Sequence, residues 1–149
     1  MKLKRFFTVF ASGTLLLSAV SGQALAGGKT VSLVIESSGD QMKFNKSEIS
    51  VSENSNVTLT FNNKSASLTH NWVLVKSGTG DQVSASGIAA GEGKSWLTSG
   101  DKNVIAFTKA VKPGKTVSVT FKAPKKGTYD FVCTSPGHNS MMKGKFIVK

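Results

Sequence analysis

The residues best suited to metal chemistry gather in one short stretch near the C-terminus. Cys133, His138, Met141 and Met142 lie there, and they include the only cysteine of the sequence, one of its two histidines and two of its four methionines. A thiolate, an imidazole and a thioether so close together form a ligand set for a soft transition metal. Copper is the first candidate, because two histidines, a cysteine and a weak axial methionine describe an electron-transfer copper centre. The second histidine must then be His70.

Strand patterns explain how these residues could meet. One alternating segment ends at Cys133 and the next begins at Met142, so that His138 lies in the connecting loop. His70 begins a distant apolar strand, and we expect it to reach the same point at the end of a β-sandwich. In this arrangement Cys133 is the strong thiolate ligand, the two neutral imidazoles complete a trigonal plane, and Met142 is a long axial contact.

Other interpretations of these residues remain open. A single cysteine is often a small buried hydrophobic residue, and methionines often fill a core. Zinc could be bound tetrahedrally by the cysteine, both histidines and a fourth ligand, although methionine is a poor zinc ligand. Cys133 and His138 could form a nucleophilic pair, but nothing nearby supplies a separate general base, so we expect no enzymatic activity. In an exported protein a free thiol is prone to oxidation, which favours a bound metal.

The first 26 residues have the pattern of a cleavable signal peptide. A basic segment at residues 1–5 precedes an apolar segment at residues 6–20, and Ala24-Leu25-Ala26 has the small-x-small pattern of a cleavage site. The apolar segment is too short for a membrane span. We therefore expect export to the periplasm, a mature chain of residues 27–149 in a single domain, and no integral membrane span in that domain.

The charge of the chain favours acidic partners. The formal net charge is +11, and the three basic residues of the signal segment leave +8 on the mature chain. Such a balance accelerates encounter with acidic surfaces, although it could also serve solubility alone. The lysines are scattered and no arginine follows Arg5, so we expect no binding to nucleic acid.

Short alternating segments separated by turn signals predict an all-β fold. The single cysteine excludes an intrachain disulfide, so the core must hold the fold. The predicted extended segments are residues 31–35, 41–45, 48–52, 56–62, 70–75, 104–107, 116–122, 128–133 and 143–149. They indicate an antiparallel Greek-key β-sandwich of about eight strands. Residues 78–100 lack alternation and are predicted to form a helical or loop flap over strand 70–75, with a short helix at residues 82–90 that Gly87 weakens.

Two motifs resemble those of known copper proteins. The ligand loop, Cys133-Thr134-x-Pro136-Gly137-His138 followed by Met142-Lys143-Gly144, closely resembles that of azurins. The first-histidine strand resembles that of azurins and auracyanins in His70-Asn71-Trp72-Val73-Leu74. The resemblance implies a cupredoxin, an eight-stranded Greek-key sandwich with one type 1 copper. Such a protein shuttles single electrons between redox proteins, such as a cytochrome or a terminal reductase or oxidase, and we expect a monomer.

The resemblance also implies roles for individual residues. The copper ligands would be His70, Cys133, His138 and Met142. The backbone N–H groups of Asn71 and Ser135 would point at the Cys133 sulfur, and the Asn71 side chain would tie its strand to Thr134. Thr69 stands where azurins have glycine, and its carbonyl is the candidate for a weak axial contact. A small apolar docking patch with a lysine at its rim is expected around the loop histidine, formed by Pro136, Gly137, Met141 and Lys143.

The sequence therefore predicts a periplasmic one-electron carrier with one blue copper. An alternative is a copper-binding protein for buffering or delivery, without a redox partner. Delivery sites tend to be open and rich in methionine or histidine, whereas this chain places its only two histidines in one closed site. A third interpretation is a metal-free β-sandwich binding module with a buried thiol.

Overall fold

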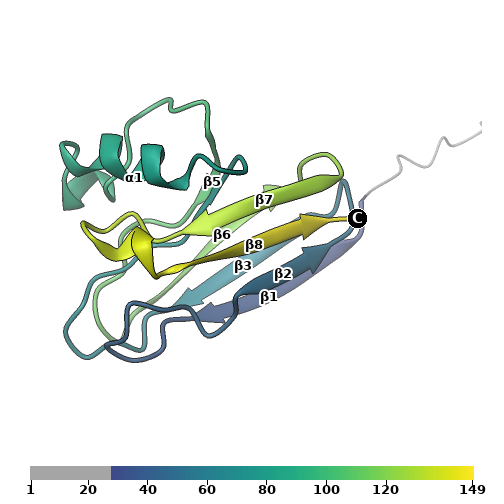
Figure 1. Ribbon diagram of the computed structural model, residues 1–149. Helices are drawn as coiled ribbons and strands as arrows, with labels where there is room; N and C mark the ends of the chain where they lie inside the picture. The colour runs from purple at the N-terminus through teal and green to yellow at the C-terminus, as the bar shows by residue number, and fades with distance from the viewer. Residues whose placement is uncertain (1–27) are drawn as a thin grey trace, which may run out of the picture.

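Two β-sheets face each other in the computed structural model of the chain (Figure 1). The structure describes residues 28–149, and the predicted signal peptide, residues 1–26, lies outside the described residues. The strands are β1 (Thr30–Glu36), β2 (Glu48–Val51), β3 (Asn56–Asn62), β4 (Val73–Val75), β5 (Val104–Phe107), β6 (Thr116–Lys122), β7 (Gly127–Val132) and β8 (Lys143–Val148). One sheet has the order β1-β3-β6, and the other has the order β2-β8-β7-β4-β5.

The predicted sandwich is confirmed, but its strands are not all antiparallel. β3, β5 and β6 have the limits that the sequence predicts. β1 pairs with β3 in parallel, and β2 pairs with β8 in parallel, so the expectation of antiparallel pairing is wrong at these two places. β2 lies between β1 and β3 in the sequence but belongs to the other sheet. The chain therefore passes from the first sheet to the second at β2 and back at β3, and β3 runs in the same direction as β1. Greek-key folds contain crossing connections of this kind.

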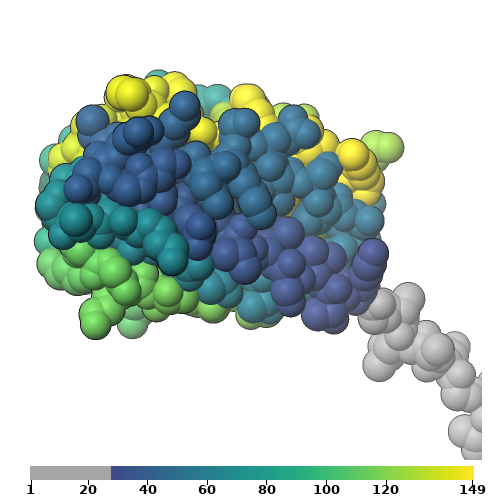
Figure 2. Space-filling view, turned by 90° about the horizontal axis from the view of Figure 1, so that it is seen from below, coloured from purple at the N-terminus to yellow at the C-terminus, as the bar shows by residue number. Residues whose placement is uncertain are grey.

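Residues 41–45 were predicted to be extended but form no strand. A single bridge joins Phe44 to Ser37, and the chain turns at Lys43, whose N–H donates to the Gln41 carbonyl at 2.7 Å. Phe44 is buried in the core, so this segment contributes one inward side chain from a turn rather than a strand. Figure 2 shows the broad face of the molecule that this N-terminal part of the chain forms, in purple and blue.

An aromatic cluster fills the space between the sheets. The Trp72 ring is fully buried, and its centroid lies 5.9 Å from that of Phe121, 6.1 Å from Phe131 and 6.4 Å from Phe146. Each aromatic pair stabilises the fold by about 0.5–1.5 kcal/mol beyond the burial of its surface. Because Trp72 follows His70 by two residues, this packing fixes the segment that carries the histidine.

The predicted flap covers the outer face of the five-stranded sheet. Helix α1 (Gly80–Ile88) lies over that sheet, and the short 3-10 helix η1 (Glu92–Lys94) follows it (Figure 1). A second apolar cluster joins flap and sheet and consists of Val73, Val75, Val83, Leu97 and Val132. A Cβ at Gly87 would lie 1.9 Å from the Trp96 carbonyl oxygen, so glycine allows this close approach. Among the described residues, no helix has the length and apolar character needed to cross a membrane.

The strand predicted at residues 70–75 is shorter than expected, because β4 begins only at Val73. His70 forms an isolated bridge with Val111. The Trp72 N–H donates to the Thr108 side-chain hydroxyl at 2.9 Å. The Thr108 side chain thus accepts the hydrogen bond that a neighbouring strand would otherwise accept. The segment that carries His70 is therefore held by separate hydrogen bonds rather than by regular strand pairing.

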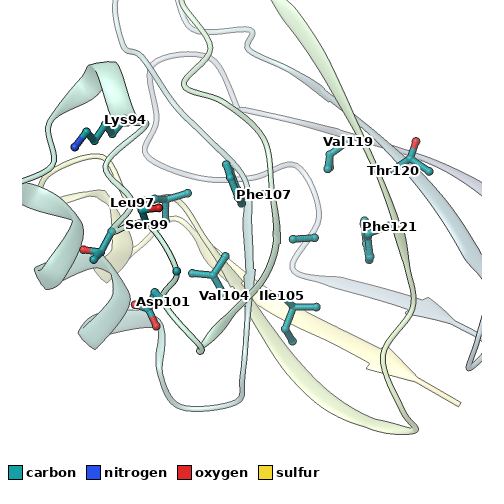
Figure 3. A pocket seen from close by; sticks show the side chains of 13 residues that line it. Lys94, Leu97, Ser99, Asp101, Val104, Ile105, Phe107, Val119, Thr120 and Phe121 are labelled. Carbon is teal, nitrogen blue, oxygen red and sulfur yellow. The ribbon is translucent and has the colours of Figure 1, made fainter.

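A groove of about 850 Å³ lies between β5 and β6, which are edge strands of the two sheets (Figure 3). Its walls are mostly apolar and include Leu97, Val104, Ile105, Phe107, Val119 and Phe121, with Lys94 and Asp101 also lining it. None of the four predicted metal ligands lines this groove, so it is separate from the predicted metal site.

Gly144 lies where β8 passes close to its neighbours. A Cβ at this position would lie 2.3 Å from Cζ of Phe131 and 2.6 Å from the Ser47 carbonyl oxygen. We predict that Gly144→Ala lowers the free energy of unfolding by about 1–3 kcal/mol, because the packed core must shift. Chemical denaturation of the metal-free protein measures the loss. Gly93→Ala is the matched control, since a Cβ there meets nothing within 4 Å; equal losses in the two variants would contradict the prediction.

Candidate metal centre

Three metal-binding atoms converge at one end of the sandwich. The Nδ1 atoms of His70 and His138 lie 3.1 Å apart. The Cys133 Sγ atom lies 3.8 Å from Nδ1 of His70 and 3.6 Å from Nδ1 of His138. His138 begins the short 3-10 helix η2 (His138–Ser140) in the loop between β7 and β8. The structure thus brings together the thiol and both imidazoles, from segments more than sixty residues apart.

The spacing of these atoms fits one metal ion. Bonds of about 2.0 Å to nitrogen and about 2.3 Å to sulfur, as in zinc sites, place the corners of a trigonal plane about 3.5–3.8 Å apart. The two sulfur–nitrogen distances agree with this, and the nitrogen–nitrogen distance is slightly shorter. Two imidazoles and one thiolate are the equatorial donors of an electron-transfer copper site.

Met142 lies next to these groups, whereas Met141 faces solvent. The Met142 N–H donates to the His138 carbonyl at 2.8 Å, and the Met142 carbonyl accepts from the Cys133 N–H at 2.9 Å. Met142 is fully buried in the same apolar cluster as Cys133. Met141 is 62% exposed. The backbone therefore holds Met142, rather than Met141, beside the convergent donor atoms.

Burial favours the uncharged forms of the donor groups. Burial, together with the neighbouring His138, lowers the pKa of His70 to about 4. Burial also lowers the pKa of His138, so both rings are neutral near pH 7, the form that binds metals. Burial raises the pKa of the Cys133 thiol, and hydrogen bonds from the backbone N–H groups of Asn71 and Ser135 act in the opposite direction. A metal must therefore displace the thiol proton.

Buried hydrogen bonds of Asn71 join the parts of the site. Its Nδ2 donates to the Ser95 carbonyl and to the Thr134 hydroxyl, both at 2.7 Å. Its Oδ1 accepts from the Thr134 N–H at 2.8 Å. Sequence patterns did not indicate Ser95, which adopts a left-handed backbone with φ of 58°. A left-handed backbone is uncommon for residues other than glycine, so the presence of a serine does not predict this conformation.

Asp40 stabilises the loop that leads to the first histidine. Its carboxylate accepts hydrogen bonds from the Ser65 hydroxyl, from the Ala66 N–H at 2.9 Å, and from the N–H and hydroxyl of Ser67 at 3.2 Å each. The bond from Ser65 is the main cause that lowers the pKa of Asp40. The sequence predicted only a turn at Gly39-Asp40, because the partners lie some 25 residues away.

The surface around His138 contains the residues predicted for docking. His138 is partly exposed, and the residues predicted for docking are all exposed near it in the sequence, namely Pro136, Gly137, Met141 and Lys143. Ile88 of α1, which is 54% exposed, lines a small cavity together with Pro136 and Gly137. Asn139 donates to the Asp81 carboxylate at 2.8 Å and so holds α1 against the loop. The helix thus adds an apolar residue to this surface that the sequence did not indicate.

Comparison with known proteins identifies the family. Residues 30–149 match the family described as copper binding proteins, plastocyanin/azurin family. The chain belongs to this family. Azurin of Pseudomonas chlororaphis is 45% identical over 121 residues, which cover 75% of this chain and 94% of that azurin. Auracyanin-A of Chloroflexus aurantiacus is 39% identical over 125 residues, which cover 83% of this chain and 77% of that protein.

Solved structures of this family have the same fold. Auracyanin A, described as a "blue" copper protein of Chloroflexus aurantiacus, matches with a TM-score of 0.78 and 39% identity over 80% of this cupredoxin and 99% of that chain. Azurin iso-2 of Methylomonas sp. strain J matches with a TM-score of 0.73 and 34% identity over 80% and 98%. This cupredoxin thus belongs to a family of blue copper proteins that transfer electrons with copper.

The Asn71 network yields a test of stability. We predict that Asn71→Ala lowers the free energy of unfolding of the metal-free protein by about 2–4 kcal/mol, because buried groups of Thr134 and Ser95 lose their partners. Chemical denaturation measures the change. Asn103→Ala is the control, since no side-chain hydrogen bond of Asn103 occurs among the described residues. A loss no larger than in this control would contradict the role of the network.

The hydrogen bonds of Asp40 predict a dependence on pH. Its folded-state pKa lies below the ordinary value of 3.8, so the ionised carboxylate adds stability above that pH and loses this effect as pH falls through the folded-state pKa. We predict that the wild type is more stable than Asp40→Asn by a constant margin near neutral pH, and that the margin shrinks in acid below 3.8. Denaturation of both proteins across this range measures the margin, and a margin independent of pH would refute the prediction.

Proposed function

We propose that this chain is a periplasmic one-electron carrier with a single type 1 copper held by His70, Cys133, His138 and Met142. When bound, copper supplies a Cu(II)/Cu(I) couple that accepts and gives one electron. The observation that carries the proposal is the triangle of one thiol and two imidazole nitrogens, with sides between 3.1 and 3.8 Å. The buried Met142 supplies the soft axial donor that completes the set.

Rigid placement of the donor groups supports electron transfer rather than catalysis. Cys133, His70 and Met142 are each fully buried, and the hydrogen bonds of Asn71 hold Thr134 beside the cysteine. Donor groups that are fixed in advance change position little between the two oxidation states. The backbone N–H groups of Asn71 and Ser135 donate to the sulfur and would tune the reduction potential.

Electrons would enter and leave at the edge of His138. His138 is partly exposed, whereas the other three proposed ligands, His70, Cys133 and Met142, are buried. Pro136, Gly137 and Met141 form an exposed apolar surface next to it, and Lys143 is exposed nearby. An apolar patch of this kind lets a partner approach the histidine closely, while lysines at its rim orient the partner.

The partners would be redox proteins with acidic docking surfaces, such as a cytochrome or a terminal reductase or oxidase. Removal of the signal peptide, residues 1–26, leaves a formal charge of +8 on the mature chain. Such a charge attracts acidic surfaces and opposes self-association, so we propose that the carrier works as a monomer. The basic and apolar pattern of the signal segment supports export to the periplasm.

Copper buffering or delivery is the alternative function, and it would require ready release of the ion. The buried positions of His70, Cys133 and Met142 oppose such release. A mild chelator that removes the copper rapidly would favour delivery. Slow release, together with fast reversible electron exchange with a cytochrome, would favour the carrier.

The ligand assignment predicts the effect of a single substitution. We expect Cys133→Ser to abolish the intense blue colour of the oxidised protein, because that colour requires a thiolate bound to Cu(II). The absorption spectrum after addition of Cu(II) measures it. Met141→Leu is the matched control in the same loop and should stay blue, since Met141 is exposed. A blue Cys133→Ser variant would show that the ligand set is wrong.

The charge of the carrier predicts the effect of salt. We expect electron exchange with an acidic cytochrome to slow steadily as ionic strength rises, because salt screens the attraction between the cationic carrier and its partner. Stopped-flow measurement of the bimolecular rate constant tests this. Rates that do not change with salt would limit the lysines to a role in solubility.

A further inference from the structure

The carbonyl of Thr69 is engaged by a side chain of the ligand loop. The Ser135 hydroxyl donates a hydrogen bond to this oxygen at 2.9 Å. Ser135 is only 2% exposed, so water does not compete readily for the bond. Thr69 immediately precedes His70, and Ser135 follows Cys133 by two residues. The bond therefore connects the two ligand-bearing segments next to the proposed copper ligands.

This hydrogen bond decides where the hydroxyl proton of Ser135 goes. A hydroxyl has a single proton to donate. The 2.9 Å distance assigns this proton to the Thr69 carbonyl, and the sulfur can still accept from the backbone N–H groups of Asn71 and Ser135.

A free Thr69 carbonyl would change the preference of the site among metals. A carbonyl oxygen is a hard donor, whereas a thiolate and a thioether are soft donors that suit Cu(I). An additional hard donor would benefit a divalent ion such as Co(II) more than Cu(I). A hydrogen bond to the oxygen reduces its ability to donate to a metal and also fixes its direction.

We propose that the Ser135 hydroxyl is a specificity-determining group that keeps the Thr69 carbonyl away from the metal and so favours copper over harder divalent ions. The inference rests on the proposed ligand set of His70, Cys133, His138 and Met142. The resemblance makes the Thr69 carbonyl a candidate axial contact. The hydrogen bond from the Ser135 side chain restrains the position of this carbonyl.

Ser135→Ala tests this proposal, because it removes the hydroxyl and retains the backbone N–H that faces the sulfur. The metal-free wild type and variant are titrated with Co(II), whose ligand-field absorption reports the number of ligands. We expect intense four-coordinate bands in the wild type and weaker five-coordinate bands in the variant. We also expect the affinity for Co(II), relative to that for Cu(I), to rise about three- to tenfold, as the loss of one hydrogen bond allows.

Ser135→Thr is the matched control, because it keeps a hydroxyl and should retain the wild-type Co(II) spectrum and affinity ratio. Ser135→Val, which has the shape of the threonine control without its hydroxyl, should match the alanine variant, and it provides a second measurement if the alanine variant does not fold. An unchanged Co(II) spectrum and affinity ratio in the alanine variant, or in the valine variant if only that one folds, would overturn the proposal. A shift of the Cu(II) thiolate band without any change in Co(II) coordination would also overturn it, because the hydroxyl would then serve the sulfur.

The failure of this inference differs from a failure of the proposed function. Wild-type protein that shows no thiolate-to-copper band with Cu(II) would contradict the ligand set itself. A blue wild type with identical Co(II) spectra in all variants would leave the ligand set intact and remove only the role of Ser135.

Discussion

The buried hydrogen bonds of Asn71 connect the two halves of the copper site. One half is the segment of His70, and the other is the loop that carries Cys133, His138 and Met142. Asn71 bonds twice to Thr134, next to the cysteine, and once to the Ser95 carbonyl of the flap. Because these groups are buried, a broken bond would leave an unpaired polar group in the core. Close approach of the thiol and the imidazoles therefore depends on this side chain.

The rest of the fold makes that connection rigid. Trp72 packs among aromatic rings between the sheets, which holds the histidine segment from inside. Helix α1 and the residues after it cover β4 from outside, so the strand is fixed on both faces. Asp40 organises the loop before Thr69. Placing the ligands near the end of a packed sandwich lets His138 remain partly exposed while the other donor groups stay dry.

Much of this arrangement could be predicted from residue types. Clean alternation predicted the limits of β3 and β6, a short apolar segment predicted those of β5, and the apolar segment before Lys76 predicted a strand covered on both faces. The convergence of the thiol with both imidazoles followed from their positions at strand ends. The parallel pairing of β1 with β3 and of β2 with β8 could not be predicted, because alternation specifies which face is buried and not the direction of the neighbour. The roles of Ser95 and Asp40 depend on partners distant in the sequence, which local patterns do not reveal.

The central claim is that one copper ion in this site carries one electron at a time. A spectroelectrochemical titration of the mature protein tests it most directly. We expect the blue absorption to saturate at one Cu(II) per chain, to disappear on uptake of one electron and to return fully on reoxidation. Saturation at more than one ion, a weak absorption without the thiolate band, or loss of the ion on reduction would contradict it.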